Sequence, residues 1–100
     1  MVSEKAGVVL GYMVYEILSD RYELLRLAVA AKHQGKGVGR QLVERLTRKR
    51  TRRRFVSANV RESNLPAQKF LRSLGFLAVR VLRGEFGSED GYRFEYTIQE

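Results

Sequence analysis

The spacing of hydrophobic positions changes several times along the chain, and each change predicts a new element. Residues 8–15 are mostly β-branched or aromatic, which indicates a strand, and residues 22–30 predict a second one. In the second strand, Leu25, Leu27 and Val29 are expected on one face, with Leu24, Arg26 and Ala28 on the other. From Val38 to about Arg50 the spacing becomes helical, with an apolar side formed by Leu42, Val43 and Leu46.

The second half of the chain repeats this change of spacing. Residues 55–60 predict a short buried strand, and Asn64 is expected to cap a helix that has Pro66 in its first turn and ends at Gly75. Two more strands are predicted at 76–82 and 92–98, joined by a polar loop at 84–91. The order strand, helix, strand around residues 22–60 predicts a βαβ crossover with parallel strands.

Residues 33–40, HQGKGVGR, place three alternating glycines and two cations between a predicted strand and a predicted helix. Glycines let a backbone approach a ligand closely, and the first N–H groups of a helix lack partners and attract anions. The loop therefore predicts a phosphate or pyrophosphate site. Its spacing fits neither a Walker loop nor the dinucleotide fingerprint.

The pattern Gln34-x-x-Gly37-x-Gly39 resembles the coenzyme A loop of the GNAT superfamily of N-acetyltransferases. The segment 27–29 is similar to the end of that family's fourth strand, and 60–64 followed by 73–76 is similar to its second signature. The likeness covers roughly residues 5–98 and is strongest to bacterial ribosomal-protein alanine acetyltransferases. It implies a single α/β (α+β) domain over 1–100, with a mixed, mostly antiparallel sheet, a βαβ crossover and two helices. By the same comparison, an N-terminal strand and two helices are missing, so the domain is expected to be N-terminally truncated.

The resemblance implies acetyl-CoA as cofactor and direct transfer of its acetyl group to a primary amine, on a protein N-terminus, a lysine or a small molecule. It implies that the strand end binds the pantetheine and acyl groups through Leu27, Ala28 and Val29. It places the pyrophosphate on the loop formed by Gln34, Gly35, Lys36, Gly37, Val38, Gly39 and Arg40. Asn64 is expected to contact the coenzyme arm.

The general base and acid of the family do not match this chain. By resemblance they fall on Asn59 and Leu71, neither of which can transfer a proton near neutral pH. Glu23 could act as base through water, and Tyr92, or alternatively Tyr96, could act as acid. The alternatives are that Glu23 is a solvated strand residue and that the tyrosine rings serve in aromatic packing while their hydroxyl groups contact water.

Charge and composition add one candidate surface and exclude several sites. The net charge is +8, and much of it lies from Arg48 to Arg54. That run is either a solvated helix end or a contact for RNA or a ribosomal surface, separate from the phosphate loop. The absence of cysteine excludes disulfides and cysteine-type zinc sites, and no metal site is predicted. No membrane span or signal peptide is visible, in keeping with the cytoplasm.

Three functions remain open on the sequence: an N-acetyltransferase, a catalytically degenerate coenzyme A-binding domain, or a small basic RNA-binding or ribosome-binding domain. If the N-terminal elements are missing, residues 8–15 should lie near a sheet edge beside an uncovered apolar face. Self-association, for instance as a homodimer, is then expected.

Overall fold

The computed structural model describes residues 2–5, 8–49 and 51–98. It contains six strands, two α-helices and one short 3-10 turn. In chain order these are β1 (Val2–Lys5), β2 (Val8–Ile17), β3 (Arg21–Val29), η1 (Ala31–His33), α1 (Val38–Thr47), β4 (Phe55–Arg61), α2 (Leu65–Ser73), β5 (Leu77–Phe86) and β6 (Glu89–Thr97).

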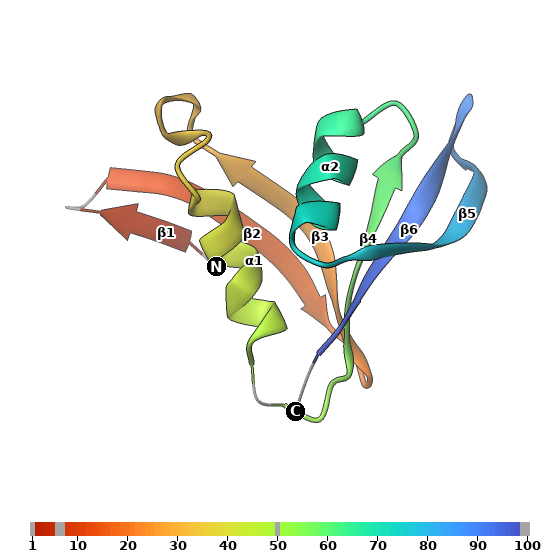
Figure 1. The fold of residues 1–100 in the computed structure, drawn as a ribbon, viewed down its shortest axis with the longest axis horizontal. Coiled ribbons are helices and arrows are strands. Elements are labelled where there is room, and N and C mark those ends of the chain that lie inside the picture. The colour runs from red at the N-terminus through yellow and green to blue at the C-terminus, as the bar shows by residue number, and fades with distance from the viewer. Residues whose placement is uncertain (1, 6–7, 50, 99–100) are drawn as a thin grey trace.

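The strands form one twisted sheet in the order β1-β2-β3-β4-β6-β5. Every neighbouring pair is antiparallel except β3 and β4, which are parallel and are joined through α1. Figure 1 shows both α-helices on the same side of the sheet. The predicted mixed fold with a βαβ crossover is therefore confirmed.

The hydrophobic core lies between the helices and this side of the sheet. Leu42, Val43 and Leu46 of α1 are fully buried there, as predicted, together with Phe76 and Phe94. Gly39 allows the helices to approach, because a Cβ at that position would lie 3.3 Å from the Phe70 ring. The helices thus share one core, and both begin near the same end of the sheet (Figure 1).

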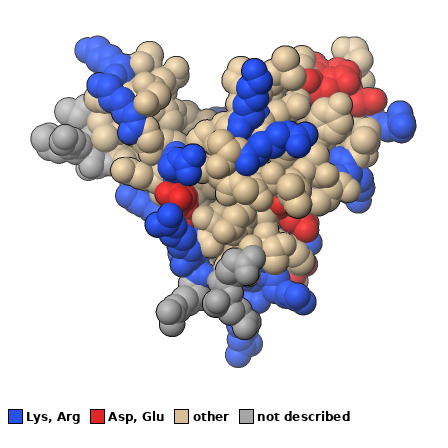
Figure 2. All heavy atoms as spheres, viewed as in Figure 1, with Lys and Arg blue, Asp and Glu red and all other residues tan. Residues whose placement is uncertain are grey.

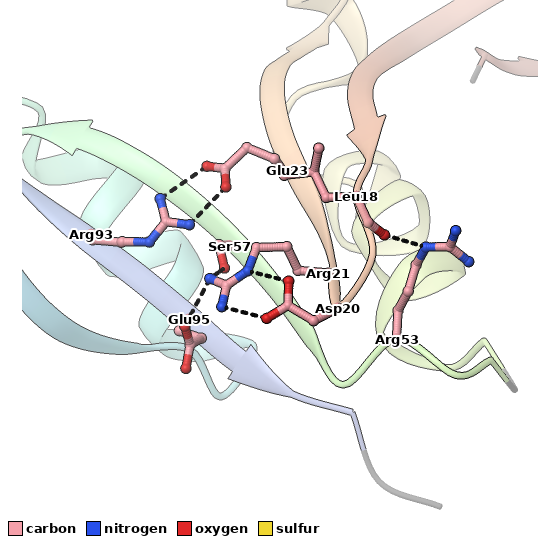
Figure 3. A network of polar contacts seen from close by, with 8 residues as sticks. All are labelled: Leu18, Asp20, Arg21, Glu23, Arg53, Ser57, Arg93 and Glu95. Carbon is pink, nitrogen blue, oxygen red and sulfur yellow. Dashed lines mark hydrogen bonds and ion pairs between the residues drawn. The ribbon is translucent and has the colours of Figure 1, made fainter.

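The opposite side of the sheet has no helix over it in the described part of the chain and carries a network of charged side chains (Figure 3). Arg21 donates to Asp20, to Ser57 Oγ and to Glu95, and Arg93 donates to both carboxylate oxygens of Glu23. These contacts join β3, β4 and β6. They let the sheet keep a polar surface over an apolar core.

The largest differences from the predicted boundaries are at the end of α1 and in segment 84–91. Helix α1 ends at Thr47 rather than near Arg50, which itself lies outside the described residues. Segment 84–91, predicted as a loop, is mostly strand: β5 and β6 extend to a turn around Gly87, and Gly84 N–H donates to Asp90. Glycine and charge in these positions suggested a loop, but a bulged hairpin accommodates both.

The strand predicted at 8–15 is paired on both sides, because the residues before it form β1. Strand β1 is the sheet edge, so residues 8–15 lie next to the edge strand and do not form the edge themselves. Ala6 and Gly7, between these strands, lie outside the described residues. No helix in the described part of the chain is long and apolar enough to cross a membrane.

Candidate functional site

Strands β3 and β4 separate partway along their length, and the separation creates the candidate site. Their parallel pairing runs from Arg21 and Phe55 to Leu24 and Ala58 and stops there. At the same point β3 bulges against β2, since Val14 pairs with Arg26 but Tyr15 pairs with Leu24, leaving Leu25 as the extra residue. A bulge bends its strand. Beyond it lies a groove of about 760 Å³, which is within the usual range for ligand sites.

The bulge also corrects the predicted faces of β3. Strict alternation placed Leu25 with Leu27 and Val29, and Leu24 on the opposite face. In the structure Leu24 is in the core, and Leu27 and Val29 pack against that core, whereas Leu25 is 55% exposed. One extra residue shifts the alternation by one position, which a period-two reading cannot detect.

The backbone of β3 presents polar groups to the groove. Ala30 N–H donates to Leu10 O on β2, so Ala28, two residues earlier, also directs its backbone groups towards β2. By the same alternation, the backbone groups of Leu27 and Val29 point to the groove, and Gln34 Nε2 donates to Val29 O at 3.3 Å. The backbone groups of Leu27 and Val29 can therefore hydrogen-bond to a ligand in the groove. Ala28 instead pairs with Tyr12 of β2.

The glycine loop closes one end of the groove at the N-terminus of α1. Gly35 and Gly37 have positive φ angles of 77° and 81°, and a Cβ at either position would meet no atom within 4 Å. Gly37 is the N-cap of α1, and no side-chain hydrogen bond caps this helix. The first-turn N–H groups and the helix dipole consequently face open space beside the exposed cations Lys36 and Arg40. This combination suits a phosphate group.

The second wall of the groove is the turn from β4 into α2. Asn64 Oδ1 accepts from Ala67 N–H at 3.2 Å, which confirms the predicted cap, and Pro66 occupies the first turn. Gln68 Nε2 donates to the carbonyls of Arg61 and Glu62, fixing the turn. Because the cap occupies only Oδ1, the Asn64 amide NH₂ is left to face a ligand in the groove that Asn64 lines.

A carboxylate borders the same turn. Glu89 accepts from Ser63 Oγ at 2.8 Å and from Ser63 N–H at 3.1 Å, with Arg61 at 3.5 Å. The Ser63 hydroxyl and N–H, assisted by the charge of Arg61, hold the pKa of Glu89 below its ordinary value. On the far side of the sheet the Arg21 guanidinium similarly lowers the pKa of Asp20.

The predicted catalytic residues are not among the groove-lining residues. Glu23 has a side chain only 14% exposed and is bound by Arg93 at 2.8 and 3.2 Å. Tyr92 packs against the core, as does Tyr96, whose ring contacts Phe76. Asn59 and Leu71, the positions at which the resemblance places a base and an acid, do line the groove. The roles of Glu23 and Tyr92 stay predictions.

Arg93 links two of these positions and was not singled out from the sequence. Its Nη1 donates to Asn59 Oδ1 at 2.8 Å while the same guanidinium holds Glu23. With Oδ1 engaged, Asn59 has its NH₂ group left to donate. Only pairing between β4 and β6 brings residues 34 positions apart together, so no local pattern could have identified the contact.

The ionisable groups that line the groove in the described part of the chain are cationic or neutral. They are Arg26, His33, Arg40 and Arg61. Phe70 and Phe86 add aromatic surface, and Phe86 was missed because it lay in a predicted loop. No group of three or more metal-ligating side chains occurs among the described residues. The cations and the aromatic surface of the groove suit an anionic ligand.

Comparison with known proteins gives a consistent picture. The family model of the acetyltransferase (GNAT) family matches residues 1–76. No curated protein sequence matches the chain significantly. The ribosomal-protein-S18-alanine N-acetyltransferase from Escherichia coli is 26% identical, with a TM-score of 0.83 over 97% of this chain and 66% of that one.

Two further solved structures share the fold. Naa20 from Chaetomium thermophilum, solved with a bisubstrate analogue, is 24% identical with a TM-score of 0.86, covering 97% of this chain and 64% of that one. NAA60 from Arabidopsis thaliana, solved with acetyl-CoA, is 20% identical with a TM-score of 0.79, covering 90% and 66%. The chain thus spans slightly less than two thirds of the length of these proteins. Since the family model covers most of the chain, the protein belongs to the GNAT acetyltransferase family.

Proposed function

We propose that this protein binds acetyl-CoA in the groove between β3 and β4 and transfers its acetyl group to a primary amine. The observation that carries the proposal is the separation of β3 and β4 beyond Leu24 and Ala58, which opens a groove that ends at an uncapped helix N-terminus. The family match and a solved neighbour that contains acetyl-CoA support it.

The residues of the groove fit the parts of this cofactor. The loop from Gln34 to Arg40 would hold the pyrophosphate through N–H groups and cations, because Gly35 and Gly37 leave their Cβ positions open. Leu27 and Val29 would bind the pantetheine arm through backbone groups, with Ala28 as the intervening residue of the strand. Asn64 would donate its amide NH₂ from the opposite wall.

When bound, acetyl-CoA would supply a thioester whose carbonyl carbon bonds to the amine nitrogen as the bond to sulfur breaks. The backbone N–H groups of β3 would stabilise negative charge on the carbonyl oxygen, and positioning would supply much of the remaining rate. The amine proton would pass through water to Glu23, and Tyr92 is the proposed proton donor for the leaving thiolate. Arg93 contacts both oxygens of Glu23, so this water must compete with a guanidinium.

A second candidate follows from the groove lining. No carboxylate is among the described residues that line it, and Asn59 and Leu71 cannot exchange protons near neutral pH. A protein with this lining can bind the coenzyme without catalysing transfer. The acceptor in either case remains an amine of unspecified type, whether on a protein or a small molecule.

Isothermal titration of acetyl-CoA into Gly37→Glu tests the proposal. A carboxylate there adds repulsion and bulk where the pyrophosphate is expected, so the affinity should fall by at least tenfold, equivalent to about 1.4 kcal/mol. Gly84→Glu is the matched control, because Gly84 also has a positive φ, 64°, and open space at its Cβ but lies on β5. Equal losses in both variants would reject the loop as the binding site.

A further inference from the structure

The charge of this protein is distributed very unevenly along the chain. Residues 24–61 contain twelve of the nineteen Lys and Arg residues but only one of the eleven acidic residues, Glu44. This segment alone has a formal charge of +11, and the rest of the chain has a charge of −3. The groove accounts for some of these cations, but those of the second half of α1 and the following loop lie beyond it.

These cations form a surface that we call the basic flank: Arg45, Arg48, Lys49, Arg52, Arg53 and Arg54. Figure 2 shows blue side chains over the exposed side of α1 and around the loop that follows it, with little red between them. Arg45, the first member of the flank, follows Val38 by seven residues, so the flank begins about 10 Å along α1 from the glycine loop. It is therefore a surface separate from the groove.

The basic flank is poorly neutralised by the protein itself. Of its six members, only Arg48 forms an ion pair with a described carboxylate, Glu44 at 2.9 Å, and that pair is at the surface. The nearby Asp20 carboxylate is engaged by Arg21. Clustered cations repel one another unless an anion is bound, so binding of an anionic partner would relieve the repulsion within this flank.

The chemistry of the basic flank suits phosphate groups and disfavours a lipid surface. Five of the six members are arginines, whose planar fork binds phosphate oxygens in a bidentate manner. The exposed apolar residues next to the flank in the described part of the chain are Ile17, Leu18 and Val2, whose carbonyl accepts from Arg45 Nη1, and these are too few for an amphipathic membrane face.

The aromatic rings beside the flank are already covered. Lys49 and Arg53 lie over Tyr22 at 5.5 Å, and Arg54 and Arg21 lie over Phe55 at 5.9 and 5.1 Å. Arg53 Nε also donates to Leu18 O at 2.7 Å (Figure 3). Among the described residues there, no stacking platform for unpaired bases is left, which indicates contact with the phosphate backbone of a helix rather than readout of bases.

We infer that the basic flank is a binding surface for the phosphate backbone of double-helical RNA, independent of acetyl-CoA binding. The surface contacts RNA without sequence preference. Its affinity falls steeply with salt, because each phosphate contact releases counterions. The inference does not depend on catalysis, since none of the six residues is among those that line the groove.

Fluorescence anisotropy with a labelled RNA hairpin, across a series of potassium chloride concentrations, tests this inference on the full chain. Arg48→Gln combined with Arg52→Gln should weaken binding several-fold at low salt and flatten the log–log salt slope by about two. Arg80→Gln combined with Arg83→Gln, on exposed positions of β5, removes the same charge and should leave the slope almost unchanged.

Three outcomes would overturn the inference. Equal losses in the two double variants would show a general charge effect rather than a site. Tighter binding to a poly-glutamate peptide or to phosphatidylserine vesicles than to the hairpin, at equal salt, would assign the basic flank to an acidic protein or a membrane. A loss of acetyl-CoA affinity in the Arg48 and Arg52 variant would show that the flank and the groove are one site.

Discussion

Leu24 on β3 and Ala58 on β4 are the last pair of the parallel ladder, and the candidate groove begins where their pairing ends. Both residues are buried in the core, so the ladder is anchored up to that pair. The bulge at Leu25 then turns the β3 backbone away. Backbone N–H and C=O groups of β3, which would otherwise pair with β4, are therefore available to bind a ligand.

Replacement of Glu23 tests the proposed base. If Glu23 accepts the amine proton through water, Glu23→Gln should lower turnover by about 100-fold or more and leave the acetyl-CoA affinity nearly unchanged. Steady-state kinetics with a primary amine acceptor measure the first quantity, and calorimetry measures the second.

Glu95→Gln is the control for this experiment, because it removes a carboxylate from the same sheet face and breaks the comparable ion pair with Arg21 at 3.2 Å. Turnover that is undiminished in Glu23→Gln eliminates Glu23 as the base. Equal losses in both variants assign the effect to the charged network of Figure 3.

Placing a carboxylate at Asn59 and a phenol at Leu71 tests whether the lack of a base and an acid in the groove limits catalysis. Asn59→Glu with Leu71→Tyr should raise kcat/KM, since both positions line the groove. Leu71 is only 4% exposed, so the larger ring should also reduce stability by about 1–3 kcal/mol.

Asn59→Gln with Leu71→Phe is the matched pair, because it adds similar bulk without titrating groups. A rate increase in this control equal to that of the restored pair would contradict the chemical explanation. Thermal melts of both pairs separate folding from catalysis.

Ser63→Ala tests the contact that borders the groove turn. Loss of the Ser63 hydroxyl should raise the pKa of Glu89 towards its ordinary value, while the Ser63 N–H and Arg61 keep part of the effect. A lowered pKa in the folded state stabilises the protein above the unfolded pKa, and that stability is lost as pH falls through the folded pKa. The variant should therefore be less stable than the parent at neutral pH, and the difference should vanish at low pH.

Carbon-detected NMR titration of the Glu89 carboxyl group, with chemical denaturation at each pH, measures both effects. Ser73→Ala is a suitable comparison, because the Ser73 hydroxyl donates to Phe70 O instead. An unchanged Glu89 pKa in Ser63→Ala would refute the assigned cause.

The edge strand β5 should promote self-association. It is the last strand of the sheet and exposes Leu77, Val79 and Val81 at 66, 52 and 48%. Exposed apolar edges invite pairing with another chain, and a lysine at the edge opposes it. Sedimentation velocity over a concentration series should show association that Val79→Lys reduces and that Leu65→Lys, at an exposed position of α2, does not. A monomer at millimolar concentration would contradict this expectation.

The features that could be predicted from the sequence are those that depend on residues close together along the chain. The glycines at 35 and 37, the cap at Asn64 and the apolar side of α1 are local patterns, and the structure has them where they were predicted. The bulge at Leu25 was missed because alternation has no signal for one extra residue. Arg93 was missed because its contacts with Asn59 and Glu23 arise from strand pairing.

The backbone amide spectrum during a titration with acetyl-CoA tests the central claim most directly. Binding in the groove should shift the amides of residues 27–40 and Asn64 first, with saturation at one equivalent, and leave the amides of β5 near Arg80 and Arg83 unchanged. Shifts confined to residues outside the groove, or no shifts at millimolar acetyl-CoA, would contradict the account.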